Sequence, residues 1–115
     1  MKARFWVVGE GAGSLRARMN ARLKKDRKRT TERAHSPLIL KRHRKSDRRP
    51  GWSSAHSRNG GRGAVRYRWN ARLKILECWA VTRGGNRPSQ IIGEFVETVL
   101  DYSNRKIKSI HIDVS

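Results

Sequence analysis

Apolar and basic residues alternate strictly along residues 65–69, where the chain reads Val-Arg-Tyr-Arg-Trp. A period of two is the pattern of a half-buried β-strand, with apolar side chains on one face and basic side chains on the other. A second run rich in β-forming residues extends from Leu73 to Thr82, after a break at Asn70. The two runs together predict a β-hairpin that turns near Asn70.

The pattern becomes helical from Ser89 onwards. Pro88 suits a first helical position, and Asn104 is a suitable helix stop. Between them, apolar residues recur at helical spacing and polar residues take the other side. The apolar stripe consists of Ile91, Ile92, Phe95, Val96, Val99 and Leu100. A closing strand is expected from Ile110 to Val114, so that the helix covers one face of a small sheet.

The beginning of the chain predicts further elements. Residues 3–8 have the composition of a strand, and Ser14 is a suitable N-cap for a basic helix that extends to Arg33. The apolar side of this helix is one thin line of residues, Leu15, Met19 and Leu23. The short apolar run at residues 37–40 predicts another strand.

The predicted fold class is therefore α+β, in one domain of 115 residues. We expect residues 64–115 to form a strand–strand–helix–strand (ββαβ) core. Residues 1–45 form a basic strand–helix segment that packs on this core. Residues 46–63 are rich in Arg, Ser, Gly and Pro, and we expect them to form a flexible arm, since loops of this length are generally functional or disordered.

The charge of the chain is distributed very unevenly. The formal net charge is +19 at pH 7, and residues 1–75 hold 23 basic and 4 acidic side chains, whereas residues 76–115 hold 5 of each. Such a charge favours a polyanion as partner, either a nucleic acid or an anionic membrane. A membrane-surface helix needs a wider apolar side, and no stretch approaches the ~18 apolar residues of a membrane span. We therefore expect a nucleic-acid partner and no membrane.

Basic residues in several regions are candidate phosphate contacts. Two dense clusters dominate, and the Arg-Gly loop, the hairpin and the turn before the second helix supply the rest. Trp52, inside the expected arm, either stacks on a base or pins the arm to the domain. The candidate nucleic-acid-binding residues are Arg22, Lys24, Lys25, Arg27, Lys28, Arg29, Lys41, Arg42, Arg44, Lys45, Arg48, Arg49, Trp52, Arg58, Arg62, Arg66, Arg68, Arg72, Arg83 and Arg87.

RNA is slightly favoured over DNA as the partner, because a flexible segment with Arg, Gly and Trp suits irregular or single-stranded targets. We expect the basic helix, arm and hairpin to grip phosphates without strong sequence reading, as in a component of a ribonucleoprotein. The N-terminal apolar run at residues 5–8 is too short for a signal-peptide core. An intracellular location is expected, in the cytoplasm or in a eukaryotic nucleus. The oligomeric state stays open.

The sequence contains little that indicates catalysis. The carboxylates form no metal-binding motif and the four histidines have no ligand spacing, so we expect no metal and no cofactor. The single cysteine, Cys78, lies in an apolar stretch and predicts a buried structural thiol. The alternative function is a small metal-independent ribonuclease of toxin type. Tyr67, His56 and the hairpin arginines would then supply its acid–base groups.

Overall fold

The computed structural model describes residues 2–10, 13–27, 36–41, 51–58, 63–83, 87–102 and 107–113. In chain order, the elements in these residues are β1 (Lys2–Gly9), α1 (Leu15–Arg27), β2 (Leu38–Leu40), β3 (Trp52–Ser57), β4 (Ala64–Asn70), β5 (Ile75–Val81), α2 (Pro88–Tyr102) and β6 (Ile107–Ile112). The fold class is α+β, as the sequence predicts.

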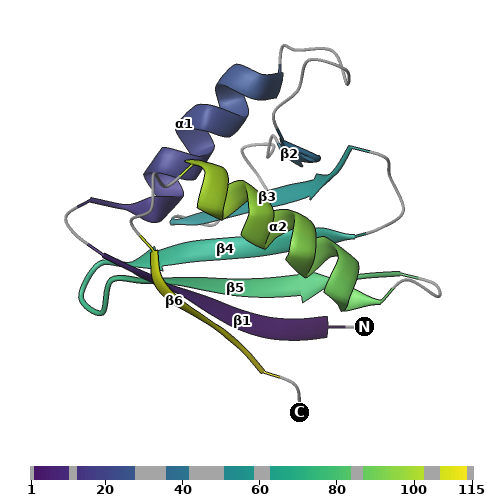
Figure 1. Ribbon diagram of the computed structural model, residues 1–115. Helices are drawn as coiled ribbons and strands as arrows, with labels where there is room; N and C mark the ends of the chain where they lie inside the picture. The colour runs from purple at the N-terminus through teal and green to yellow at the C-terminus, as the bar shows by residue number, and fades with distance from the viewer. Residues whose placement is uncertain are drawn as a thin grey trace.

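The six described strands form one antiparallel sheet in the order β2-β3-β4-β5-β1-β6. Strands β2 to β5 follow one another as a meander, and β1 then lies between β5 and β6 (Figure 1). The predicted hairpin is confirmed, because Asn70 at the end of β4 pairs with Ile75 at the start of β5. The second strand begins two residues later than expected, since Leu73 and Lys74 belong to the turn.

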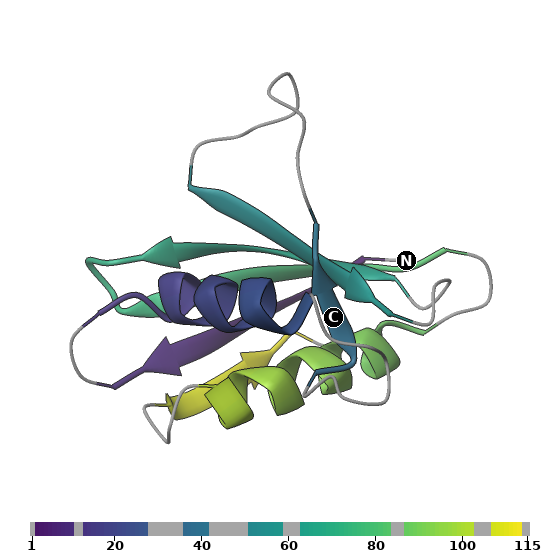
Figure 2. The same ribbon diagram turned by 90° about the horizontal axis from the view of Figure 1, so that it is seen from above.

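Both helices pack on the same face of the sheet. Figure 1 shows α2 lying across β4 and β5, and Figure 2 shows α1 and α2 on the same side of these strands. The predicted N-cap is confirmed, because Ser14 Oγ accepts a hydrogen bond from the Ala17 N–H at 3.1 Å. The apolar line of α1 is buried as expected, and α2 buries Ile91, Ile92, Phe95, Thr98 and Val99.

The hydrophobic core lies between this face of the sheet and the two helices. Phe5 of β1, Tyr67 of β4 and Phe95 of α2 are completely buried at its centre. The ring centroid of Phe95 lies 5.5 Å from that of Phe5 and 5.2 Å from that of Tyr67. Cys78 is a buried free thiol, as its apolar surroundings predict. The core therefore uses the apolar half of each strand and leaves the other half to the opposite face.

The expectation of a flexible arm over residues 46–63 is wrong for Trp52–Ser57, which form β3. This strand lies inside the sheet, between β2 and β4. The sequence pattern does not indicate β3, because its residues are mostly small and polar. Strand formation also depends strongly on the neighbouring strands. Residues 42–50 and 59–62 of the expected arm and basic cluster lie outside the described residues.

A ββαβ core formed by residues 64–115 is not confirmed. Strands β4 and β5, helix α2 and strand β6 do follow one another in the chain, but β6 pairs with β1. The final strand also starts earlier than expected, at Ile107. The remainder of the first predicted helix, from Lys28 to Arg33, lies outside the described residues.

Candidate nucleic-acid interface

The face of the sheet opposite the helices carries the side chains that alternate with the core residues along each strand. On β4, Arg66 and Arg68 are exposed and flank the fully buried Tyr67. The cross-strand register brings side chains from four adjacent strands together on this face. They are Arg4 and Trp6 of β1, Trp52 of β3, Arg66 and Arg68 of β4, and Trp79 of β5. We call these six residues the Arg–Trp face.

The Arg–Trp face is an alternating series of guanidinium groups and indole rings. Its order is Trp6, Arg4, Trp79, Arg68, Trp52 and Arg66, and the distances from each arginine Cζ to the next ring centroid along the series are 5.0, 4.9, 5.6, 5.0 and 5.5 Å. All five distances lie within the ~6 Å range of cation–π attraction. The Trp52 and Trp79 rings also contact each other, with centroids 4.9 Å apart. The six side chains therefore support one another in a continuous row.

Glu77 of β5 adds a carboxylate to this surface. It lies opposite Arg68 on β4 and opposite Trp6 on β1. Its Oε2 accepts a hydrogen bond from Arg68 Nε. The Glu77 side chain is 14% exposed, whereas the Arg68 side chain is 47% exposed. The ion pair orients Arg68 while nearly half of that side chain remains accessible to a phosphate.

Helix α1 holds the strand that carries Trp52 from the other side of the sheet. Arg16 Nε donates to Ser53 Oγ at 2.8 Å, and its Nη2 donates to the Trp52 carbonyl oxygen at 3.4 Å. Asn20 Nδ2 donates to the same Ser53 oxygen at 2.7 Å. The Tyr67 hydroxyl donates to Asn20 Oδ1 at 2.5 Å. These bonds join α1, β3 and β4 directly behind the Arg–Trp face, so the backbone at Trp52 is held in position.

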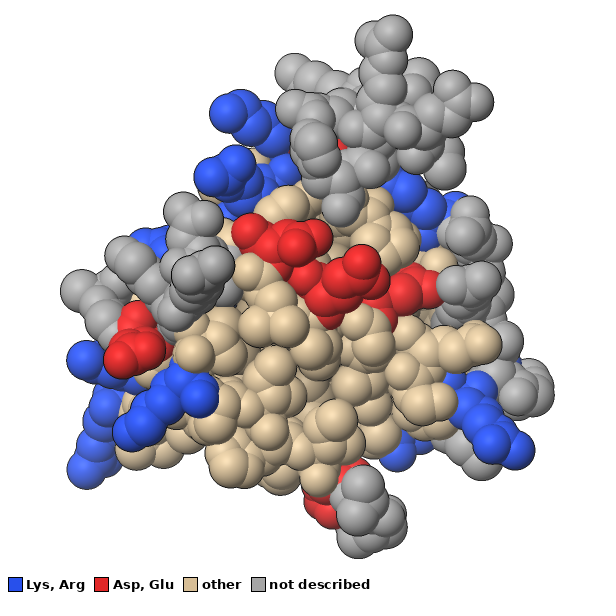
Figure 3. Space-filling model, viewed as in Figure 1, with Lys and Arg blue, Asp and Glu red and all other residues tan. Residues whose placement is uncertain are grey.

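The surface of α2, on the helix side of the molecule, has the opposite charge. Helix α2 contains Glu94, Glu97 and Asp101 and has no Lys or Arg. Figure 3, viewed from the helix side, shows acidic side chains across the middle of the surface and basic side chains around its rim. The surface of α2 is therefore unfavourable for a polyanion, whereas the Arg–Trp face carries three arginines beside the carboxylate of Glu77.

The structure distributes the predicted contact residues over several surfaces. Trp52, Arg66 and Arg68 lie in the Arg–Trp face. Other predicted residues are exposed in helix α1, in turns or at the ends of elements: Arg22, Lys24, Lys25, Lys41, Arg72, Arg83 and Arg87. Arg27 is the last residue of α1. The predicted residues outside the described part of the chain are Lys28, Arg29, Arg42, Arg44, Lys45, Arg48, Arg49 and Arg62.

Arg58, expected to contact a phosphate, instead has a structural role. Its Nη2 lies 3.3 Å from Asp26 Oδ2, and the two side chains are only 10% and 3% exposed. Arg58 Nε also donates to the Ser36 carbonyl oxygen at 3.0 Å. The guanidinium is therefore neutralised between the end of α1 and the end of β3, and it does not belong to the candidate interface.

Three residues of the Arg–Trp face were not among the predicted contacts: Arg4, Trp6 and Trp79. The strand at residues 3–8 was predicted, and alternation puts Arg4 and Trp6 on the face opposite Phe5. Alternation in β5 likewise separates Trp79 from the buried Cys78. The signal for an uncovered face was thus present in each strand, but the sequence does not show which strands are neighbours.

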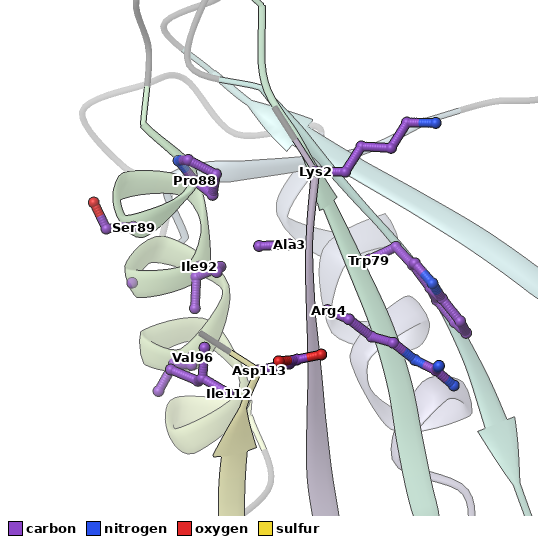
Figure 4. A pocket seen from close by; sticks show the side chains of 11 residues that line it. Lys2, Ala3, Arg4, Trp79, Pro88, Ser89, Ile92, Val96, Ile112 and Asp113 are labelled. Atoms are coloured by element: carbon purple, nitrogen blue, oxygen red, sulfur yellow. The ribbon is translucent and has the colours of Figure 1, made fainter. Parts of the chain in front are cut away.

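An apolar groove borders the Arg–Trp face. It has a volume of about 840 Å³ and lies between α2 and the start of β1. Its apolar lining includes Ala3, Ile92 and Val96. In Figure 4, Arg4 and Trp79 lie on the side of β1 away from α2, so the groove meets the Arg–Trp face at these two residues.

The described residues contain neither a metal-binding cluster nor a membrane-spanning helix. Among the described residues, no three His, Cys, Asp or Glu side chains are arranged to hold a metal ion. Neither described helix has the length and apolar character needed to cross a membrane. Comparison of the sequence with known protein families, with curated proteins and with solved structures finds no match.

Proposed function

We propose that this protein binds nucleic acid through the Arg–Trp face, with RNA favoured over DNA. The observation that carries the proposal is the cluster of three arginines packed against three tryptophans on a sheet face that neither described helix covers. Guanidinium groups bind phosphate oxygens in a planar, bidentate geometry. A net charge of +19 adds long-range attraction for a polyanion.

The preference for RNA follows from the shape of the interface. DNA-binding modules commonly insert a helix or a two-stranded ribbon into the major groove. The Arg–Trp face instead offers side chains on the broad surface of a sheet, and such contacts suit irregular RNA better. They also carry little sequence information, because most are made to phosphates. Broad RNA binding of this kind suits a component of a ribonucleoprotein, inside the cell.

The ribonuclease alternative is not favoured by the geometry. Tyr67 is completely buried on the helix side of the sheet, where its hydroxyl is bonded to Asn20. Burial also raises the pKa of Tyr67 well above its ordinary value. His56 pairs with Ala64 across β3 and β4, and the strand register directs it to the opposite face. The two residues proposed as an acid–base pair therefore face different sides of the sheet.

The proposal is tested with two variants of equal charge change. One carries Arg4→Gln, Arg66→Gln and Arg68→Gln, and the control carries Arg22→Gln, Lys24→Gln and Lys25→Gln on α1. Binding to a fluorescein-labelled RNA is measured by anisotropy across a range of salt concentrations. We expect the first variant to bind RNA at least ~100-fold more weakly than the wild-type protein, because each charged contact contributes roughly 1 kcal/mol.

The salt dependence gives an independent readout. Each lost phosphate contact should make the plot of log K against log salt less steep by about 0.7 on a single strand. The Arg–Trp face variant should therefore lose about 2 from the slope, and the α1 control should lose less. Equal losses in both variants would remove the Arg–Trp face as the interface. Wild-type protein that does not bind at ~100 mM salt would refute nucleic-acid binding itself.

A further inference from the structure

Three of the four tryptophans in the chain lie on the face of the sheet opposite the hydrophobic core. Trp6, Trp52 and Trp79 are only partly buried there, whereas Trp69 packs against the core from the helix side. The core is already filled by completely buried side chains that include Phe5, Tyr67 and Phe95. Large aromatic rings gathered on a surface that no described helix covers are typical of an interaction site.

The three rings form a strip that crosses the sheet. Trp52 lies on β3, Trp79 on β5 and Trp6 on β1, so the strip extends across three strand spacings. Trp52 and Trp79 come from the strands on either side of β4, and their ring centroids are 4.9 Å apart, so these two rings meet above β4. Arg4 links Trp79 to Trp6, because its Cζ lies 4.9 and 5.0 Å from the two ring centroids.

The guanidinium groups lie beside the rings rather than apart from them. Arg4 contacts both Trp6 and Trp79, and Arg68 lies beside the Trp79–Trp52 ring pair, with Cζ-to-centroid distances of 4.9 to 5.6 Å. A base that stacks on an indole ring would thus have its phosphate within reach of an arginine. This arrangement couples a contact to the base with a contact to the backbone.

From this geometry we infer that the Arg–Trp face binds unpaired nucleotides, whose bases stack on Trp52, Trp79 and Trp6. The inference rests on the proposed nucleic-acid binding and narrows it to single-stranded segments. In a duplex, each base is stacked between its neighbours and has no free ring surface for an indole. In a single strand every base can offer one, whatever its identity, so this binding tolerates many sequences.

Part of the site is held in its binding geometry before a ligand arrives. Arg16 and Asn20 of α1 bond to Ser53, directly after Trp52, and Arg16 also bonds to the Trp52 carbonyl oxygen. The Trp52 ring is in contact with the Trp79 ring. A surface that is ordered in advance loses less conformational freedom on binding, and this raises affinity.

A purely structural role for the same residues makes a different prediction. Cross-strand pairs and cation–π contacts also stabilise a sheet without any ligand. In that case the tryptophans would affect folding stability, but binding would depend on phosphates alone. A ligand that has phosphates and lacks bases distinguishes the two roles.

The experiment compares three fluorescein-labelled ligands on the wild-type protein at ~150 mM salt. They are a 12-nucleotide RNA without self-complementarity, the same RNA annealed into a duplex, and an abasic strand with the same number of phosphates. Stacking contributes on the order of a 10-fold gain in affinity for each base. We expect the single strand to bind at least 10-fold more tightly than either other ligand. It should also quench tryptophan fluorescence, which the abasic strand should not.

Variants assign the effect to individual rings. Trp52→Leu and Trp79→Leu remove a stacking surface and keep apolar bulk, and Trp69→Leu on the helix side is the matched control. Each of the first two should weaken single-strand binding about 10-fold more than it weakens abasic binding, which depends on the arginines beside the rings. Trp69→Leu should lower the melting temperature without this selective loss.

The outcomes separate the two proposals. Equal affinity for the single strand and the abasic strand, or tighter binding to the duplex, would overturn the stacking inference and leave nucleic-acid binding standing. Absence of binding to all three ligands would overturn both. Because the ligand comparison uses unaltered protein, it decides the inference even if a tryptophan variant fails to fold.

Discussion

Arg58, which directly follows β3, and Arg66 of the neighbouring strand β4 have different surroundings. The Arg58 side chain is almost buried and pairs with Asp26. The Arg66 side chain is exposed over the Trp52 ring, on the surface that faces solvent. Sequence reading treated both as phosphate contacts because each belongs to a basic, glycine-rich region. Burial and the presence of an acidic partner distinguish the two side chains, and neither can be read from residue type.

Two core residues, Tyr67 and Cys78, have ionisable side chains that remain neutral. Burial raises the pKa of Tyr67 well above its ordinary value near 10, and the charge of Arg16 opposes this effect. Burial also raises the pKa of the Cys78 thiol, and the neighbouring Glu77 carboxylate raises it further. Both groups are therefore protonated in the folded protein at pH values where the unfolded chain has released the proton.

We predict that the stability of the protein falls as the pH rises above about 9. The unfolded chain loses protons from Cys at about 8.5 and from Tyr at about 10, while the folded chain retains both. The contribution is fully present below these values, and it declines by up to ~1.4 kcal/mol per pH unit for each group. Urea unfolding at pH 7 to 10.5 measures it. Cys78→Ala should move the onset up to about 10, and an unchanged free energy of unfolding between pH 7 and 10 would contradict the prediction.

At the level of elements, the helices and strands with clear periodicity were predictable. The apolar stripe of α2 and the alternation of β4 identify both elements, because each period depends only on neighbours in the chain. Strand β3 was not predictable in this way. Its segment, Trp-Ser-Ser-Ala-His-Ser, has a weak apolar pattern, and it becomes a strand because β2 and β4 supply hydrogen-bond partners on both sides.

Gly93 in α2 supports a prediction about this helix. Its position is exposed, and a Cβ atom there would have nothing within 4 Å. Gly93→Ala should therefore stabilise the protein by about 1 kcal/mol, the difference in helix propensity. Chemical unfolding measures the change. Gly63→Ala is the contrasting variant, because Gly63 has a φ of +124° and a Cβ there would collide with the Val81 carbonyl oxygen. A loss of stability in Gly93→Ala would contradict the prediction.

At the scale of the whole molecule, β1 joins the two parts of the C-terminal half of the chain, β5 and β6, within the sheet. Strand β1 pairs with β5 on one side and with β6 on the other. It also supplies Phe5 and Val7 to the core, both completely buried. The sequence suggested that residues 64–115 form the core and that the N-terminal strand–helix segment packs on it, since residues 64–115 contain the clearest patterns. The topology makes that core dependent on residues from the opposite end of the chain.

We predict that residues 64–115, expressed alone, do not fold. Without β1, strand β6 loses the partner that it has in the full chain, and the core loses two buried side chains. An isolated unit of about 50 residues also buries too little surface to be stable without this help. A ¹H–¹⁵N NMR spectrum should show narrow dispersion for the fragment and wide dispersion for the full chain. A well-dispersed spectrum of the fragment would show that β6 can pair differently.

The sequence alone determined the α+β class, the type of most elements and the two faces of the strands with clear alternation. These properties depend on residues close together in the chain, so their periodicity is visible without a structure. Only the tertiary structure decided that Trp52 lies beside Arg68 and that Arg4 lies beside Trp79. Strand order and register bring these residues together from distant parts of the chain, and one local pattern is compatible with many strand orders. The candidate interface is therefore a property of the assembled sheet.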